Sequence, residues 1–107
     1  MVINEPMERL VVYAPQDNGV SSERLRTIVS ATTMAARDIG VQLDGVLKRN
    51  TLAVSIYYEK GGKENWVYSD WEKNLSREKI YEIVRDLTFI LKHVSRRTSE
   101  ENESQNV

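Results

Sequence analysis

The chain has 107 residues, of which 40% are hydrophobic, and this argues for one folded domain and against global disorder. Basic and acidic side chains number 15 and 16 over the whole chain, so the basic excess typical of a dedicated double-helix binder is missing. No cysteine is present, which excludes disulfides, thiolate metal sites and a cysteine nucleophile.

The first half of the chain predicts a strand, a helix and a second strand. After a lead-in over residues 1–6, residues 8–14 predict a short strand with Leu10 and Val12 on one face, and Pro15 ends it. Apolar residues at helical spacing predict a helix over 22–39. Ser21 precedes it as an N-cap and Gly40 follows it in a left-handed C-terminal position.

The middle of the chain predicts three consecutive strands joined by two tight turns. Residues 41–48 alternate, and Arg49 with Asn50 forms the first turn because Asn tolerates positive φ. The stretch 51–71 contains two runs of β-branched and aromatic residues around Gly61 and Gly62. A two-glycine connection between such runs is a strong hairpin signal.

The last third predicts a helix and a tail. An apolar stripe follows the predicted N-cap Ser76 and predicts a helix over 77–94. Residues 96–107 are polar throughout, and we expect a disordered tail there. The expected domain spans residues 1–95.

The order β-α-β-β-β-α predicts an α+β two-layer sandwich, with the last three strands as an antiparallel meander and both helices on one face. From the first helix onward the order resembles that of double-stranded RNA-binding domains. This resemblance is topological only, since none of that family's motifs is visible and the leading strand has no place in it.

Register counting from the two turns divides the sheet residues between two faces. A two-residue glycine turn pairs Lys60 with Lys63, and an Arg49-Asn50 turn pairs Leu47 with Leu52. The predicted core face holds Val41, Leu43, Leu47, Leu52, Val54, Ile56, Tyr58, Val67 and Trp71. The predicted outer face holds Gln42, Asp44, Val46, Ala53, Ser55, Tyr57, Trp66, Tyr68 and Asp70.

The outer aromatic residues are the main candidates for an interface. Exposed aromatic clusters are unusual on small domains and aromatics are enriched in interface cores, so we expect a homodimer or protein contact through Tyr57, Trp66, Tyr68, Gln42 and Ser55. The alternatives are a solvated sheet face with aromatic cross-strand pairs, a stacked base or other ligand, and coverage by the N-terminal segment.

A nucleic-acid interface is the second hypothesis. Lys60 and Lys63 make the hairpin tip basic, while Lys73, Arg77 and Lys79 surround the start of the last helix. Cations are disfavoured at a helix N-terminus by its dipole, and a bound phosphate would explain them. The simpler alternative is a set of exposed ion pairs with nearby glutamates.

Catalytic chemistry has little support in the residues. The single histidine, His93, has no visible partner set. Asp44 and Asp70 share the predicted outer face about 10 Å apart, but such pairs are common on polar faces. Neither a phosphate loop nor a metal-ligand cluster is visible, so we expect no cofactor, no metal and no enzyme.

The sequence also shows no membrane-spanning run and no secretory signal. We therefore expect a cytoplasmic, non-enzymatic interaction or regulatory module that self-associates through the aromatic sheet face.

Overall fold

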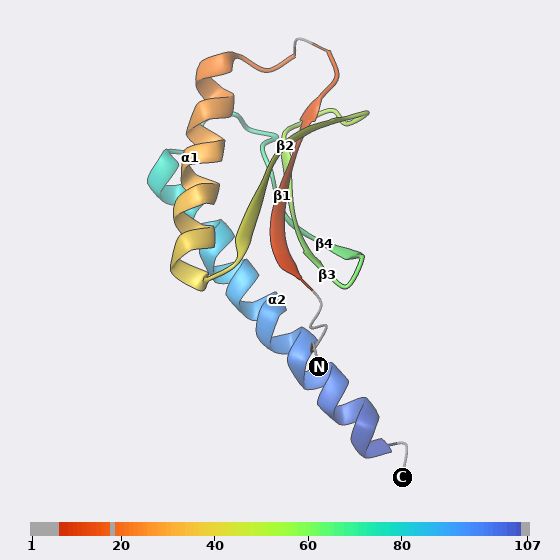
Figure 1. The fold of residues 1–107 in the computed structure, drawn as a ribbon. Coiled ribbons are helices and arrows are strands. Elements are labelled where there is room, and N and C mark those ends of the chain that lie inside the picture. The colour runs from red at the N-terminus through yellow and green to blue at the C-terminus, as the bar shows by residue number, and fades with distance from the viewer. Residues whose placement is uncertain (1–6, 18, 106–107) are drawn as a thin grey trace.

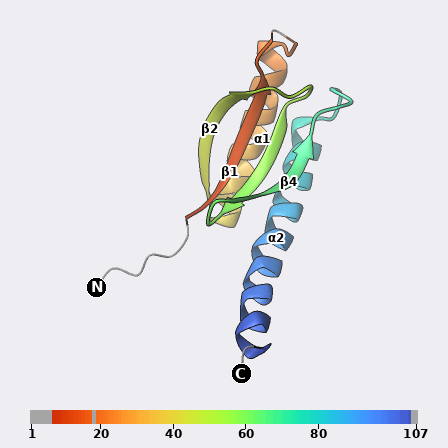
Figure 2. The same cartoon turned by 90° about the vertical axis from the view of Figure 1, so that its right-hand side faces the viewer.

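The computed structural model describes residues 7–17 and 19–105, with side chains up to residue 94. The elements are β1 (Glu8–Pro15), α1 (Ser22–Ile39), β2 (Gln42–Arg49), β3 (Ser55–Lys60), β4 (Lys63–Ser69) and α2 (Arg77–Gln105). Both helices pack on the same face of a single sheet, and the opposite face carries no helix (Figures 1 and 2). The α+β class and the element order are thus confirmed.

Both helices begin where the sequence predicts. The Ser21 hydroxyl accepts a hydrogen bond of 3.1 Å from the Arg24 N–H, and the Ser76 hydroxyl accepts one of 3.1 Å from the Lys79 N–H. Gly40 ends α1 with φ 84°, in the left-handed region that costs glycine nothing.

Helix α2 is longer than predicted. It was expected to end at residue 94 but continues to Gln105. Its 29 residues span roughly 44 Å, whereas β4 with 7 residues spans roughly 23 Å, so α2 runs on beyond the sheet (Figure 2). Residues 1–6 and 106–107, and all side chains from 95 onward, lie outside the described part. The division into a domain and a polar tail stays a prediction.

The predicted antiparallel meander is wrong. The strand order is β2-β1-β3-β4, with β1 parallel to β2 and antiparallel to β3. A strand, a long helix and a second strand form a crossover unit that places the two strands side by side and parallel. The β1 strand therefore lies between β2 and β3, and the three-stranded antiparallel sheet of double-stranded RNA-binding domains is not formed.

Residues 50–54 carry the chain from β2, across the end of β1, to β3. The expected tight turn at Arg49 and Asn50 does not pair β2 with β3. Ala53 and Val54 are buried, while Leu52 is 83% exposed. Leu52, predicted for the core, and Ala53, predicted for the outer face, therefore exchange roles because they belong to a connection rather than a strand.

A bulge in β2 reverses the second half of that strand. Leu10 of β1 lies opposite Leu43, but Val12 lies opposite Val46, so β2 holds one residue more than β1 over this step. Gly45 supplies the positive φ of 60° that the bulge needs. As a result Val46 shares the face of Val12, and Leu47 lies on the outer face instead of the core.

The glycine hairpin is confirmed over its first half. Lys60 lies opposite Lys63, and Tyr57 lies opposite Trp66. The register then shifts, since Ile56 lies opposite Tyr68 and not Val67. This bulge adds one residue to β4 and turns the remaining side chains of that strand over.

The bulge corrects three face assignments. Tyr68 and Asp70, predicted for the outer face, are 7% and 2% exposed. Trp71, predicted for the core, is 64% exposed. The core forms between the inner sheet face and the two helices, and its buried members are Leu10, Val12, Ile28, Ala31, Ala35, Ala36, Val54, Ile56, Tyr58, Val67, Tyr68, Ile80 and Val84.

Candidate interaction surface

The described part of the molecule offers three candidate sites. They are the outer face of the sheet, a pocket at the start of α1, and a groove between β4 and α2. They differ in how many of their polar groups are paired within the chain and in how much apolar surface they leave exposed.

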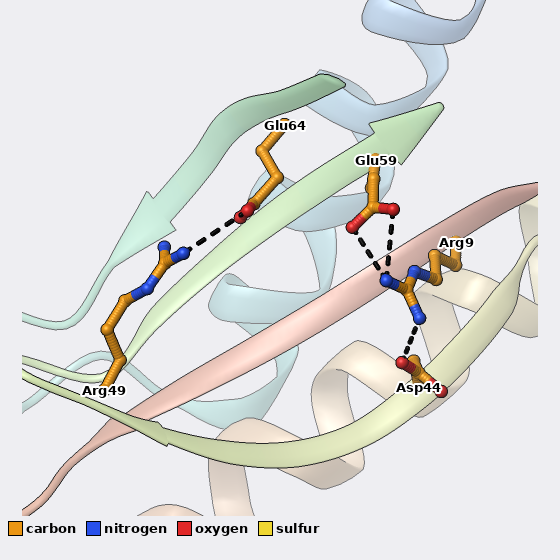
Figure 3. A network of polar contacts seen from close by, with 5 residues as sticks. All are labelled: Arg9, Asp44, Arg49, Glu59 and Glu64. Atoms are coloured by element: carbon orange, nitrogen blue, oxygen red, sulfur yellow. Dashed lines mark hydrogen bonds and ion pairs between the residues drawn. The ribbon is translucent and has the colours of Figure 1, made fainter. Parts of the chain in front are cut away.

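The outer face carries paired charges that link side chains of neighbouring strands (Figure 3). Arg9 donates to Asp44 and, at 3.0 and 2.9 Å, to both carboxylate oxygens of Glu59. The hydrogen bond that Arg9 donates to Glu59 and the charge of Asp44 raise the pKa of Arg9, and together they outweigh burial, which lowers it. Since β2, β1 and β3 each contribute one residue, this network bridges three adjacent strands.

A second layer of the outer face is aromatic. The guanidinium of Arg49 lies 3.8 Å from the centre of the Tyr13 ring, and Tyr13 packs edge-on against Tyr57 with ring centres 5.6 Å apart. Arg49 also reaches Glu64 at 3.4 Å. Val11, which points to this face between Leu10 and Val12, is 0% exposed. The face therefore seals itself with its own long side chains.

The expected interface residues do not form one patch. Tyr57 is half-buried in the outer aromatic layer, and Tyr68 lies in the core. Ser55 is buried, with its hydroxyl 2.9 Å from that of Ser69. Gln42 lies on β2 and Trp66 on β4, at opposite edges of the sheet, about 14 Å apart at three strand spacings.

The pocket at the start of α1 has a volume of about 460 Å³. On its wall, the Arg24 side chain donates to Asp70 at 2.8 and 2.6 Å and to the Leu75 carbonyl at 2.7 Å. The Tyr68 hydroxyl donates to the same Asp70 carboxylate at 2.7 Å. These contacts tie α1 to the end of β4 and to the segment leading into α2.

Burial raises the pKa of Asp70, but the hydrogen bonds from Arg24 and Tyr68 outweigh burial and place the pKa below its ordinary value. Burial and the bond to Asp70 both raise the pKa of Tyr68. Asp70 is therefore ionised, and it holds Tyr68 inside the fold. Asp44 lies on β2 at the far edge of the sheet, so the pair of carboxylates expected on one face does not exist.

The groove between β4 and α2 is apolar and open. It has a volume of about 360 Å³ and is lined by Trp66, Val67, Tyr68, Ser69, Trp71, Glu72, Leu75, Ile83 and Leu87. Trp66 and Trp71 are 56% and 64% exposed. Large apolar residues rimmed by polar ones are typical of interaction sites.

The groove continues along α2. Ile83 and Leu87 line it, and Ile90 and Val94 follow at helical spacing with about half of each side chain exposed. Positions separated by four, three and four residues share one helix face. The sequence showed this stripe but did not show that it divides, with Ile80 and Val84 entering the core and Ile90 and Val94 remaining outside.

The basic residues of the nucleic-acid hypothesis fall into two separate groups. Lys60 binds Glu8 at 3.3 Å, and Glu8 also binds Lys92 at 3.3 Å. Lys73, Arg77 and Lys79 lie at the other end of β4, roughly 20 Å from the hairpin tip along the strand.

Glutamates already accompany two of the three cations in that second group. Arg77 binds Glu78 at 3.3 Å and Lys79 lies 3.9 Å from Glu82. The exposed His93 packs against Phe89, with ring centres 4.3 Å apart and ring planes tilted by 59°.

Among the described residues, no group of three or more His, Asp or Glu side chains could hold a metal ion. Within the same part of the chain, no helix is long and apolar enough to cross a membrane.

Comparison with family models, with curated proteins and with solved structures gives no match.

Proposed function

We propose that the chain is a non-enzymatic interaction module that self-associates, and that the groove between β4 and α2 carries the contact. The observation behind the proposal is the exposure of three large apolar side chains beside β4 and along α2, namely Trp71, Ile90 and Val94. Trp66, opposite Tyr57 on the outer side of β4, is also exposed and lines the same groove. Leaving such side chains in water is unfavourable at roughly 25 cal/mol per Å² of apolar surface.

The outer face gives weaker support for association. Its charges are paired within the chain, and covering it with a partner would require removing water from Arg9, Asp44 and Arg49. Desolvation of charged groups offsets much of what a new contact gains. The groove carries no such cost at Trp71 or Ile90.

Light scattering at tens of micromolar tests the proposal. The wild type should show twice the monomer mass, and Ile90→Glu should return it to the monomer because the new carboxylate would lie in the contact. Leu52→Glu is the control, since Leu52 is an exposed apolar residue outside the groove, at 83% against 52% for Ile90. A monomeric wild type at this concentration would refute self-association.

The competing nucleic-acid hypothesis makes a different prediction. Two separated and partly neutralised basic groups should give weak binding to mixed RNA and DNA. The plot of the logarithm of the binding constant against the logarithm of the salt concentration should have a slope no steeper than about −2. Fluorescence anisotropy at several salt concentrations measures this slope. Tight binding with a slope near −5 would favour nucleic-acid binding over the module proposed here.

A further inference from the structure

We infer that the occupant of the groove is α2 of a second copy of this chain, packed antiparallel about a two-fold axis that passes between Leu87 and Ile90. This inference depends on the proposed function and specifies the geometry of its contact.

The spacing of the exposed strip is self-complementary. Ile83, Leu87, Ile90 and Val94 repeat every four, three and four residues, which is the pattern of a helix–helix seam. In an antiparallel pair centred between Leu87 and Ile90, Leu87 faces Ile90 of the partner subunit and Ile83 faces Val94 of the partner subunit. Each layer then joins one half-buried residue to one half-exposed residue.

The polar flank of the strip is complementary in the same register. Asp86, which accepts a hydrogen bond of 2.9 Å from Arg85, and the exposed His93 lie on the solvent side of the seam, two helical turns apart. In the antiparallel register Asp86 and His93 of the partner subunit lie on the same side of the seam and are offset by two residues, or about 3 Å of helix rise, and the two-fold axis makes this contact twice. In a parallel register, the Asp86 side chains of the two subunits would lie on opposite sides of the seam, away from either His93.

The shape and surface of α2 favour a helix as the occupant rather than an added strand. The bulge at Val67 and Tyr68 distorts the free edge of β4, and bulges of this kind discourage edge-to-edge pairing. Helix α2 instead continues past the sheet (Figure 1). On this helix Ile90 and Val94 are about half exposed, so neither α1 nor the sheet buries them fully.

The surface is large enough to start a stable contact. Two tryptophans, each more than half exposed, offer roughly 250 Å² of apolar area. The seam from Ile83 to Val94 adds about 18 Å of helix length and carries the contact toward the roughly 800 Å² per partner of a standard interface.

A charge-reversal cycle tests the register. His93→Glu should weaken the dimer by at least tenfold, because it places Glu beside Asp86 of the partner subunit twice. The double variant Asp86→Lys/His93→Glu restores opposite charges and should return the dissociation constant to within threefold of wild type. Sedimentation equilibrium measures the wild type, the single variants Asp86→Lys and His93→Glu and the double variant, and circular dichroism checks that each is folded.

The outcomes separate this inference from the proposed function. Suppose that the wild type is dimeric, that Ile90→Glu is monomeric, and that the loss of dimer affinity in the double variant equals the combined losses of the two single variants. The antiparallel register is then overturned, while self-association through the groove stands. A monomeric wild type overturns both.

Cross-linking gives an independent measurement, because the chain contains no cysteine. Mixing single variants Asp86→Cys and His93→Cys with a short bismaleimide should give a mixed 86–93 dimer, while each variant alone should cross-link poorly. Self-cross-linking of Asp86→Cys that is at least as efficient as the mixed reaction would contradict the antiparallel register and refute the inference.

Discussion

The outer face of the sheet and the groove between β4 and α2 both display aromatic side chains, but they differ in what covers those rings. On the outer face, Arg49 lies over Tyr13, and Tyr13 packs against Tyr57. In the groove, Trp66 and Trp71 remain more than half exposed. An aromatic cluster thus indicates an interface only where the chain leaves it uncovered.

The difference arises from the bulge in β4. Without the extra residue, Tyr68 would extend the aromatic cluster of the outer face and Trp71 would enter the core. With it, Asp70 and Tyr68 turn inward to Arg24, and Trp71 is left beside α2. The contacts around Asp70 therefore determine which surface is apolar.

The largest expected effect comes from removing Asp70. Asp70→Ala leaves the mostly buried Arg24 without its carboxylate and should lower the free energy of unfolding by about 3 kcal/mol. Asp44→Ala, which removes an exposed partner on the outer face, should cost at most about 1 kcal/mol. Urea unfolding measures both. Equal losses would show that the two surfaces do not differ in the way proposed.

The pH dependence of stability tests the same carboxylate. The pKa of Asp70 lies below its ordinary value of 3.8, so the folded state holds the ionised form more strongly than the unfolded chain does. This contribution is complete above about pH 5 and is lost as the pH falls below 4 toward the lowered pKa.

The free-energy gap between wild type and Asp70→Asn should therefore shrink between pH 5 and pH 3 in denaturant titrations. A gap that stays constant over this range would mean that Asp70 is not held in its ionised form by Arg24.

A smaller effect is expected from Arg49. Arg49→Ala removes an exposed ion pair and a cation–π contact, and should lower the free energy of unfolding by about 0.5–1 kcal/mol. The dimer should be unchanged, because Arg49 belongs to the self-sealed face. Sedimentation of this variant checks that the dimer is unchanged. Dissociation to monomers would show that the contact lies on the outer face and not in the groove.

Much of the fold follows from local patterns. The caps at Ser21, Gly40 and Ser76 and the glycine hairpin each arise from neighbouring residues, and all agree with the structure. The helical stripe of α2 was also visible. These features are local, so spacing and capping residues are sufficient to predict them.

The sheet order and the two bulges depend on contacts distant in sequence. Gly45 inside a strand and the adjacent apolar pair Val67-Tyr68 were the available indications of bulges. The helix between two strands indicated a parallel pair. A one-residue shift reverses every later side chain, and for this reason the sequence alone assigns Tyr68 and Trp71 to the wrong faces.

The most direct measurement of the central claim compares one residue from each surface in a sedimentation series. Trp71→Ala should raise the dimer dissociation constant at least 30-fold, as expected for a tryptophan at the centre of a contact. Tyr57→Ala should change it less than threefold. Dissociation by Tyr57→Ala with no effect of Trp71→Ala would contradict the account and return the contact to the outer face.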